Sequence, residues 1–521
     1  MKLLRSPWVR LALFGLLCFL LILASQISWD GSYRTAYGVP RSYAPFGDEV
    51  RREDGSIDYR ATLNQLLGEP LPPEKNAAVV FAKLAARGEL QDPKLRTLVF
   101  KTIGFSEDKY AAGAAFFEDY RKAEAANPAA SESIWAGDQD HPQTAAWLDR
   151  YPNELTELRT ACQLEWRVPF FNLDHSSPIA SDLLPLAQSR RIGARMLLAD
   201  AFREAGRGNA DAAISEIVAV YELGLNSTGQ VAIEDLISDA VRGMGILAAE
   251  KLLKRHVLSE AQLRELANGF QCEWLPAAFS PEIGRGERYL VLDALQGIER
   301  NQFASSELGK LFLPNNPEAN LFSLGYGPFV DRGAVLQNLN LNYDTLSQCQ
   351  QLSELQGSAV NKLLQALKAK PRLGAPLGGD KESGDHILSF WLGFAFSPKY
   401  RGQSVGAMLF DYSSTFIYQT AAATIRIAQQ RRLLELAIAL ERYQRAHGAH
   451  PNSLDQLVPE FLPNLPPDHF AERGSFGYQK LEDGFRVFAN PSRPSKLPRW
   501  PGLSFEIVVD RSAKKPEEPS K

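Results

Sequence analysis

The chain has 521 residues, of which 45% are hydrophobic and 23% are charged, and its formal net charge is −4. These proportions are typical of globular proteins and exclude a collagen-like or largely disordered chain. The small negative charge gives no basic surface that would gather nucleic-acid phosphates, so we expect no nucleic-acid partner. At about 150 residues per domain, the length allows about three domains, or one large helical body with a small domain.

The N-terminal sequence predicts a segment that enters a membrane. Basic residues precede an apolar run at residues 11–27, which only Ser25 and Gln26 interrupt. This charge pattern predicts a cytoplasmic N-terminus with the rest of the chain outside the cytoplasm. The length fits both a short membrane helix and the apolar part of a cleaved signal peptide. We favour the uncleaved anchor because Trp8 and Trp29 flank the run, which predicts a single-pass protein of the inner (cytoplasmic) membrane with a periplasmic body.

Apolar periodicity and Gly- or Pro-rich joints divide the chain into regions. The predicted regions are a membrane anchor or signal segment at 1–29, a tether at 30–55, an N-terminal helical region at 56–180, a central helical bundle at 181–400, a long helix with an α+β module at 401–510, and a disordered tail at 511–521. The expected fold class is mainly α, with an antiparallel helical bundle or hairpin body. A small C-terminal α+β module adds a three-stranded antiparallel sheet to the long helix.

The clearest helical pattern covers residues 182–270. Asn209 and Ser259 are expected N-caps, and Gln262 would complete a capping box with Ser259. Short joints favour antiparallel packing of neighbouring helices. The first pair of helices is similar in spacing to a tetratricopeptide unit but lacks its closing proline. We favour a non-repeating bundle, with a repeat array as the alternative.

The predicted helix that follows carries acids and bases close together, an arrangement that could line a catalytic cleft. We do not interpret it as one. The charged residues are Arg285, Glu287, Arg288, Glu299 and Arg300. Ion pairs three or four residues apart are common on the solvated face of a helix, and this is our interpretation.

The four cysteines are Cys18, Cys162, Cys272 and Cys349. None forms a closely spaced pair, so a zinc knuckle or a redox motif is excluded. The sequence is compatible with one disulfide in an oxidising compartment and also with buried free thiols.

Residues 402–406, Gly-Gln-Ser-Val-Gly, match the nucleophile-elbow pattern around Ser404. That motif needs a buried strand before the serine and a helix after it, so that the hydroxyl is exposed at a sharp turn. The preceding residues are polar and include Pro398, so we interpret the motif as a plain turn before a long helix. Asp455 and His469 follow in the order of a catalytic triad, but order alone carries little weight.

Two histidines, His447 and His450, lie where the long helix from about residue 407 is expected to end. Gly448 is typical of a left-handed helix stop, and Pro451 cannot continue the helix. We interpret this stretch as the end of one helix and the start of another.

The next helix is expected to begin with a capping box formed by Ser453 and Gln456. A zinc site, the alternative for this region, needs three or four ligands, so Asp468 and His469 would have to fold back towards the two histidines. We therefore predict no metal, no cofactor and no catalytic residue.

The C-terminal segment carries a characteristic set of positions: Ala439, Leu440, Tyr443, Gly448, Pro451, Leu454, Leu457, Leu465, Pro466 and Asp468. In these positions it resembles the periplasmic head of the major pseudopilin of type II secretion systems. The resemblance implies a small antiparallel sheet, and strand patterns at 475–480, 485–490 and 503–510 predict one independently, with a hairpin turn at residues 482–484. The predicted membrane segment lies some four hundred residues upstream, which argues against an assembling pilus subunit.

The whole chain resembles uncharacterised bacterial membrane-anchored helical proteins in which such a head ends a helical body. We therefore expect an extracytoplasmic scaffold or interaction protein of the bacterial envelope, attached to the membrane through residues 11–27 and bound to protein partners there. Its being an enzyme is the less favoured expectation. The alternative is a secreted or anchored hydrolase that uses Ser404 or a metal near His447 and His450.

Overall fold

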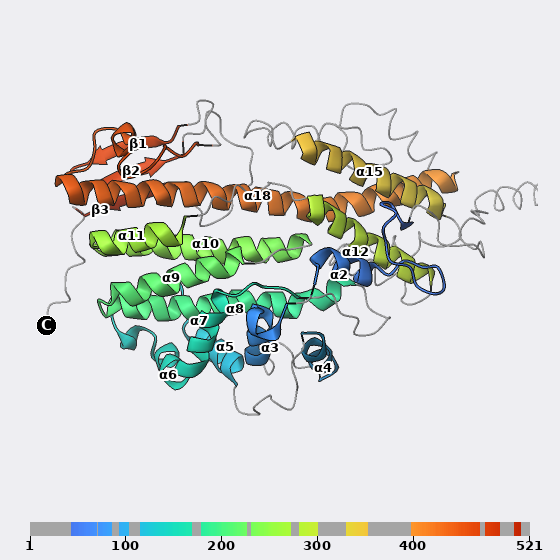
Figure 1. Ribbon diagram of the computed structural model, residues 1–521, viewed down its shortest axis with the longest axis horizontal. Helices are drawn as coiled ribbons and strands as arrows, with labels where there is room; N and C mark the ends of the chain where they lie inside the picture. Colours follow the sequence, from blue (N-terminus) through green and yellow to red (C-terminus); the bar gives the residue numbers. More distant parts are fainter. Residues whose placement is uncertain are drawn as a thin grey trace, which may run out of the picture.

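The computed structural model describes part of the chain, to which every structural statement below refers. The described residues are 43–69, 71–85, 93–103, 115–168, 179–226, 231–271, 281–300, 330–352, 397–468, 475–489 and 505–511. Their fold is mainly helical with a small antiparallel sheet near the C-terminus (Figure 1), which confirms the predicted fold class. The predicted membrane segment at residues 11–27 lies outside these ranges, and no helix within them is both long and apolar enough to cross a membrane.

The N-terminal helical region consists of short helices. They are α2 (Tyr59–Leu67), η4 (Pro73–Lys75), α3 (Ala77–Ala85), α4 (Pro93–Thr102), α5 (Phe116–Ala126), η6 (Asp138–Asp140), α6 (Pro142–Arg150) and α7 (Pro152–Cys162). Helix α2 begins where the Asp58 carboxylate accepts a hydrogen bond from the Ala61 N–H at 3.0 Å. It ends at Gly68, whose φ of +79° a side chain would disfavour. Local capping chemistry therefore sets both ends of this helix.

The central helices are longer. They are α8 (Ile179–Gly206), α9 (Ala210–Leu225), α10 (Ala232–Arg255), α11 (Glu260–Gly269), α12 (Pro281–Glu299) and α15 (Arg332–Leu352). Helices α8, α9 and α10 pack against one another. The predicted caps are confirmed: Asn209 accepts from Ala212 N–H, and Ser259 and Gln262 form the reciprocal capping box of α11.

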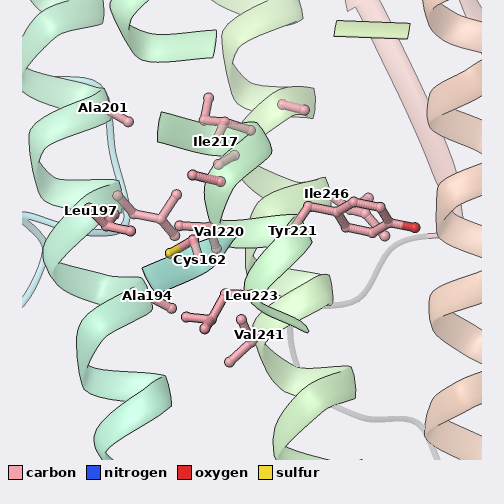
Figure 2. Packing of buried hydrophobic residues seen from close by; sticks show 14 of the residues in the cluster. Cys162, Ala194, Leu197, Ala201, Ile217, Val220, Tyr221, Leu223, Val241 and Ile246 are labelled. Carbon is pink, nitrogen blue, oxygen red and sulfur yellow. The ribbon is translucent and has the colours of Figure 1, made fainter. Parts of the chain in front are cut away.

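The larger of two hydrophobic cores joins all three helical parts of the chain. It contains side chains from α3 to α11, the second half of α18 (Pro398–His447) and the sheet. Figure 2 shows Cys162 of α7 among Leu197 of α8 and Val220 of α9. Cys162 is a fully buried free thiol, and burial raises its pKa. Cys18 and Cys272 lie outside the described residues, as does the side chain of Cys349.

The smaller core lies around the first half of α18. It combines apolar side chains of α2, α12 and α15 with Val405, Leu409 and Ile417 of α18. Helix α18 has 50 residues and contacts both cores along its length (Figure 1). Our predicted start near residue 407 is wrong, because Ser397 caps the helix by accepting from the Tyr400 N–H at 3.2 Å. Pro398 occupies the first helical turn, where its missing N–H is tolerated.

The sheet has the order β1-β2-β3, with β1 (Gly477–Leu481), β2 (Gly484–Phe488) and β3 (Glu506–Asp510) all antiparallel. The predicted hairpin is confirmed, although Gly484 already pairs with Leu481, so that only two residues connect β1 and β2. One face of the sheet buries Phe485, Val487 and Ile507 in the larger core. The sheet therefore depends on α18 and α10 for burial.

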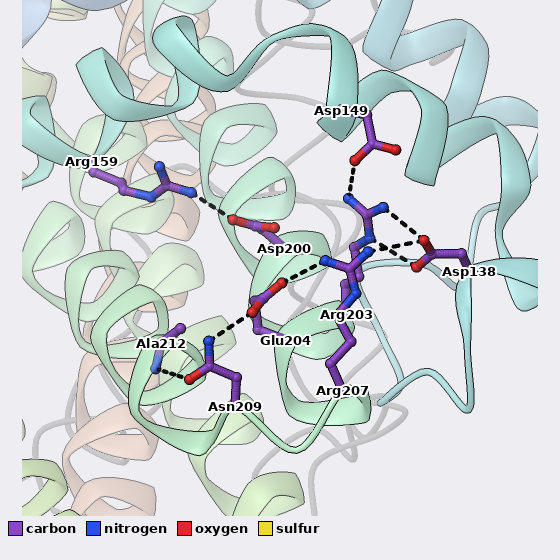
Figure 3. A network of polar contacts seen from close by, with 9 residues as sticks. All are labelled: Asp138, Asp149, Arg159, Asp200, Arg203, Glu204, Arg207, Asn209 and Ala212. Carbon is purple, nitrogen blue, oxygen red and sulfur yellow. Dashed lines mark hydrogen bonds and ion pairs between the residues drawn. The ribbon is translucent and has the colours of Figure 1, made fainter.

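Charged side chains tie the N-terminal helices to the end of α8 (Figure 3). The Arg203 guanidinium donates to both carboxylate oxygens of Asp138, at 2.8 and 2.9 Å, and to Asp149 at 2.7 Å. These hydrogen bonds lower the pKa of Asp138 to about 2. Arg203 is 5% exposed, so its guanidinium is held in one position and fixes η6 and α6 against α8.

Candidate functional site

Ser404 lies inside helix α18 and not at an exposed turn. Its side chain is 1% exposed, and its hydroxyl donates to the Tyr400 carbonyl at 2.9 Å. A nucleophile elbow requires an accessible serine at a strand-to-helix turn. The interpretation of this stretch as a turn is therefore wrong, and the position of Ser404 also counts against its use as a nucleophile.

The two glycines of the same motif have a packing role. A Cβ atom added to Gly402 would lie 2.1 Å from the Asp331 carbonyl oxygen, and one added to Gly406 would lie 2.4 Å from the Val335 carbonyl oxygen. Both distances are far below van der Waals contact. The Gly-x-Ser-x-Gly pattern thus marks the face on which α18 closely approaches the start of α15.

His447 belongs to the end of α18. Its ring stacks on Tyr443 with centroids 4.1 Å apart, and its Nδ1 lies 3.1 Å from the Tyr443 carbonyl oxygen. Gly448 follows with φ of +77°, and its N–H donates to the Gln444 carbonyl at 2.8 Å. The predicted helix stop is confirmed.

His450 has different surroundings from His447. It is 8% exposed and packs its ring edge-to-face on Phe485 of β2, with centroids 5.2 Å apart. Burial lowers the pKa of the His450 imidazole. Asp468 was a possible ligand in the alternative zinc site. It is buried and accepts a hydrogen bond from the Gln429 amide at 2.6 Å. His469 lies outside the described residues, and within them no group of three or more His, Cys, Asp or Glu side chains could hold a metal ion.

The predicted capping box at Ser453 does not form. The helix there is a short 3-10 turn, η7 (Leu454–Leu457), and the Ser453 side chain makes no capping hydrogen bond. Gln456 accepts instead from the Asn452 N–H at 2.6 Å. Asp455 is exposed on this turn. The chain therefore turns sharply here, against the end of α18.

A hollow of about 310 Å³ lies between α18, η7 and the start of β1. It is lined by Leu436, Asn452, Ser453, Leu454, Asp455, Leu465, Pro466, Ser475, Phe476 and Tyr478. Tyr478 closes one side, with its hydroxyl donating to the Pro451 carbonyl at 2.8 Å. The wall combines apolar side chains with the polar residues Asn452, Ser453 and Asp455, so it offers both kinds of contact to a small ligand or a single side chain.

A buried ion pair within α10, on the side that contacts α18, was missed by sequence reasoning. Arg242 donates to Asp239 one turn away, and Thr424 of α18 donates to the same carboxylate at 2.6 Å. Asp239 is 1% exposed, and burial raises its pKa although Arg242 opposes the shift. Burial also raises the pKa of neighbouring Asp235 to about 7. The spacing of these charges is typical of a solvated helix face, so the sequence carries no signal that α18 covers them.

The charged residues of α12 are not the solvated face that we predicted. Glu287 is buried and accepts from the Ala232 N–H at 2.8 Å, so it satisfies the N-terminus of α10. Burial raises its pKa to about 7. Arg288 is 3% exposed and pairs with Asp344 of α15 at 2.7 Å. The prediction is wrong because the partners come from distant segments and not from the same helix.

Comparison of the chain with protein families, with curated proteins and with solved structures found no match. The resemblance of the C-terminal segment to a pseudopilin head therefore stays a prediction.

Proposed function

We propose that the chain is a membrane-anchored, extracytoplasmic interaction protein of the bacterial envelope. In this proposal the helical body is a scaffold, and the C-terminal module is the part that contacts a protein partner. The observation that carries the proposal is the hollow beside β1. The sheet of the module lies at one end of α18 (Figure 1). Leu436 and Phe476 form an apolar part of the wall of the hollow that suits a partner's side chain, and polar residues stand beside them.

The pseudopilin-like segment supports this proposal because its matching positions pack together. Ala439, Leu440 and Leu457 are buried in the larger core, and Tyr443 and Leu465 pack partly buried against it. A head of this kind would be a recognition element built onto the end of the scaffold. The anchor at residues 11–27 and the periplasmic location of the body are parts of the same proposal.

A hydrolase that uses Ser404 fits poorly, because the hydroxyl is buried and donates to the Tyr400 carbonyl. Within the described ranges no observation favours a hydrolase that uses Ser404 over an interaction protein.

The proposal is tested by site-specific photo-crosslinking in cells that express the full chain. A photoreactive residue replaces exposed Ser453 at the hollow, and a matched one replaces exposed Asn153 on α7, away from the module (Figure 1). We expect an envelope protein to be crosslinked from position 453 and not from 153. Mass spectrometry of the mature N-terminus and protease treatment of spheroplasts test the anchor. A soluble protein that begins at Ser25, or equal crosslinking at both positions, would refute the corresponding part.

A further inference from the structure

One edge of strand β1 carries backbone groups that point away from the sheet. The Ala489 N–H donates to the Phe505 carbonyl at 2.9 Å, so alternate residues of β2, including Val487, direct their backbone groups to β3. Hydrogen-bonding direction alternates along a strand, and Arg486 therefore bonds towards its partner Gln479 in β1.

The backbone groups of Tyr478 and Lys480, which lie on either side of Gln479 in β1, consequently point outward. In the described part of the chain no other backbone group is hydrogen-bonded to them. An edge of this kind is a template for pairing with another extended chain.

The hollow lies below this same edge. Tyr478 of β1 and Phe476 just before the strand line it on one side, and Leu436 of α18 lines it from the helix. Tyr478 is paired with Val487, which is buried in the larger core, so the face of β1 that carries Tyr478 is the one that faces α18. A strand added beside β1 would place every second side chain on this face, above the hollow.

The size and the charges of the site define the segment that fits it. About 310 Å³ is near the lower end of the range for ligand pockets and suits one or two apolar side chains. Lys480 is exposed, with its Nζ 3.5 Å from the Asn452 side-chain oxygen, so an acidic residue beside it would be favoured. Asp455 lines the hollow and disfavours an acidic residue inside it.

We propose that β1 binds an extended segment of a protein partner by strand addition, with an apolar side chain in the hollow and an acidic side chain two residues away beside Lys480. This inference rests on the proposed interaction function and specifies its site. Backbone hydrogen bonds to Tyr478 and Lys480 would supply affinity, and the hollow would supply specificity.

The test uses the full chain in detergent micelles and two fluorescent, end-blocked peptides of equal composition. In Thr-Val-Thr-Leu-Thr-Glu-Thr the leucine and glutamate are two residues apart and share a face of an extended strand. In Thr-Val-Thr-Leu-Glu-Thr-Thr they are adjacent and lie on opposite faces. We expect saturable binding of the first peptide, at least tenfold tighter than that of the second.

Two proline variants distinguish this edge from the opposite one. Lys480→Pro removes an outward amide from β1, and Val508→Pro removes an outward amide from β3, since Val508 pairs with Arg486. We expect Lys480→Pro to weaken binding of the first peptide at least tenfold and Val508→Pro to leave it unchanged, with circular dichroism confirming that both fold. Lys480→Gln, which keeps the amide, should weaken binding less than Lys480→Pro does.

Absence of saturable binding, equal binding of the two peptides, or unaltered binding by folded Lys480→Pro would overturn strand addition. So would a dimer of the chain, detected by sedimentation, that Lys480→Pro dissociates, because the occupant would then be a second copy. Crosslinking from position 453 that persists in Lys480→Pro would refute strand addition but leave the proposed function standing. If no envelope protein is crosslinked from position 453 in the chain that keeps Lys480, the proposed function itself is refuted.

Discussion

The two ends of α18 pack against different kinds of neighbours. The first half lies on α15 and α12 in the smaller core, where Gly402 and Gly406 allow close approach to the backbone of α15. The second half, through residues such as Leu433 and Leu440, lies in the larger core with α10, α11 and the sheet (Figure 1). One helix therefore belongs to two cores, and at the smaller core a close backbone contact with α15 is added to side-chain burial.

Between the two cores the contact of α18 with α10 is polar. Thr420 donates to the Ala232 carbonyl at 3.3 Å, and Thr424 donates to Asp239, which is paired with Arg242. Polar groups that are buried in this way must be satisfied, so they fix the alignment of the two helices more strictly than apolar contacts do. Helix α18 therefore has three zones that differ in their sensitivity to substitution: the close contact with α15, the polar contact with α10, and the C-terminal half in the larger core.

The largest effect is expected in the polar zone. Arg242→Met leaves the Asp239 carboxylate buried without its cation, and we expect a loss of about 3–5 kcal/mol in the free energy of unfolding. Urea denaturation of the full chain measures it. The double variant Asp239→Asn with Arg242→Met removes both charges and should recover most of the loss. If the single and double variants are equally unstable, the ion pair is not the cause.

The next effect is a dependence of stability on pH that arises where α12 meets α10. Burial raises the pKa of Glu287 from 4.5 to about 7, so the folded state holds a proton that the unfolded state releases between these values. The stabilisation is full below about pH 4.5 and is lost as the pH rises through about 7, by roughly 3 kcal/mol.

The variant Glu287→Gln should be more stable than the unsubstituted chain at pH 8 and similar to it at pH 4.5, because an amide keeps an acceptor for the Ala232 N–H. Denaturation midpoints at the two pH values measure the difference. Exposed Glu265→Gln on α11 is the control, with no expected change. A parallel shift of both variants would show that Glu287 is not responsible.

In the close-contact zone, Gly402→Ala should destabilise the chain by about 2 kcal/mol. Alanine normally stabilises a helix relative to glycine by about 0.5–1 kcal/mol, but here its Cβ would overlap the Asp331 carbonyl oxygen. Half-buried Gln403→Ala is the control within the same helical turn and should change stability by less than about 0.5 kcal/mol. A Gly402→Ala protein as stable as the unsubstituted one would mean that α15 and α18 are less closely packed.

The smallest effect is expected at the C-terminal end of α18. Gly448→Ala places a side chain at φ of +77° but in open space, so only the backbone preference is lost, at about 1 kcal/mol. Gly208, with φ of +82° and also nothing nearby, is the matched site at the end of α8, and Gly208→Ala should cost about the same. Thermal unfolding compares the two. A markedly larger loss at Gly448 would indicate that the turn into η7 also depends on this glycine.

The elements that were predicted correctly have their causes close together in the chain. Gly448 ends α18, Ser259 and Gln262 form a capping box, and the hairpin between β1 and β2 lies where its turn residues place it. Two of the incorrect predictions, the turn at Ser404 and the solvated face of α12, have distant causes. The Asp331 carbonyl that Gly402 approaches lies just before α15, and the Ala232 N–H that donates to Glu287 is 55 residues away in the chain.

The sequence by itself determined the mainly helical class, the helix stops and the hairpin, because these follow from hydrogen bonds and backbone preferences within a few residues. Only the tertiary structure decided which charged faces are buried, that Ser404 lies within a helix, and that the edge of β1 stands above a hollow. Thr424 and Asp239 are 185 residues apart in the chain yet share a hydrogen bond. Burial of this kind depends on which helices meet, and local spacing looks the same whether a charged face contacts water or another helix.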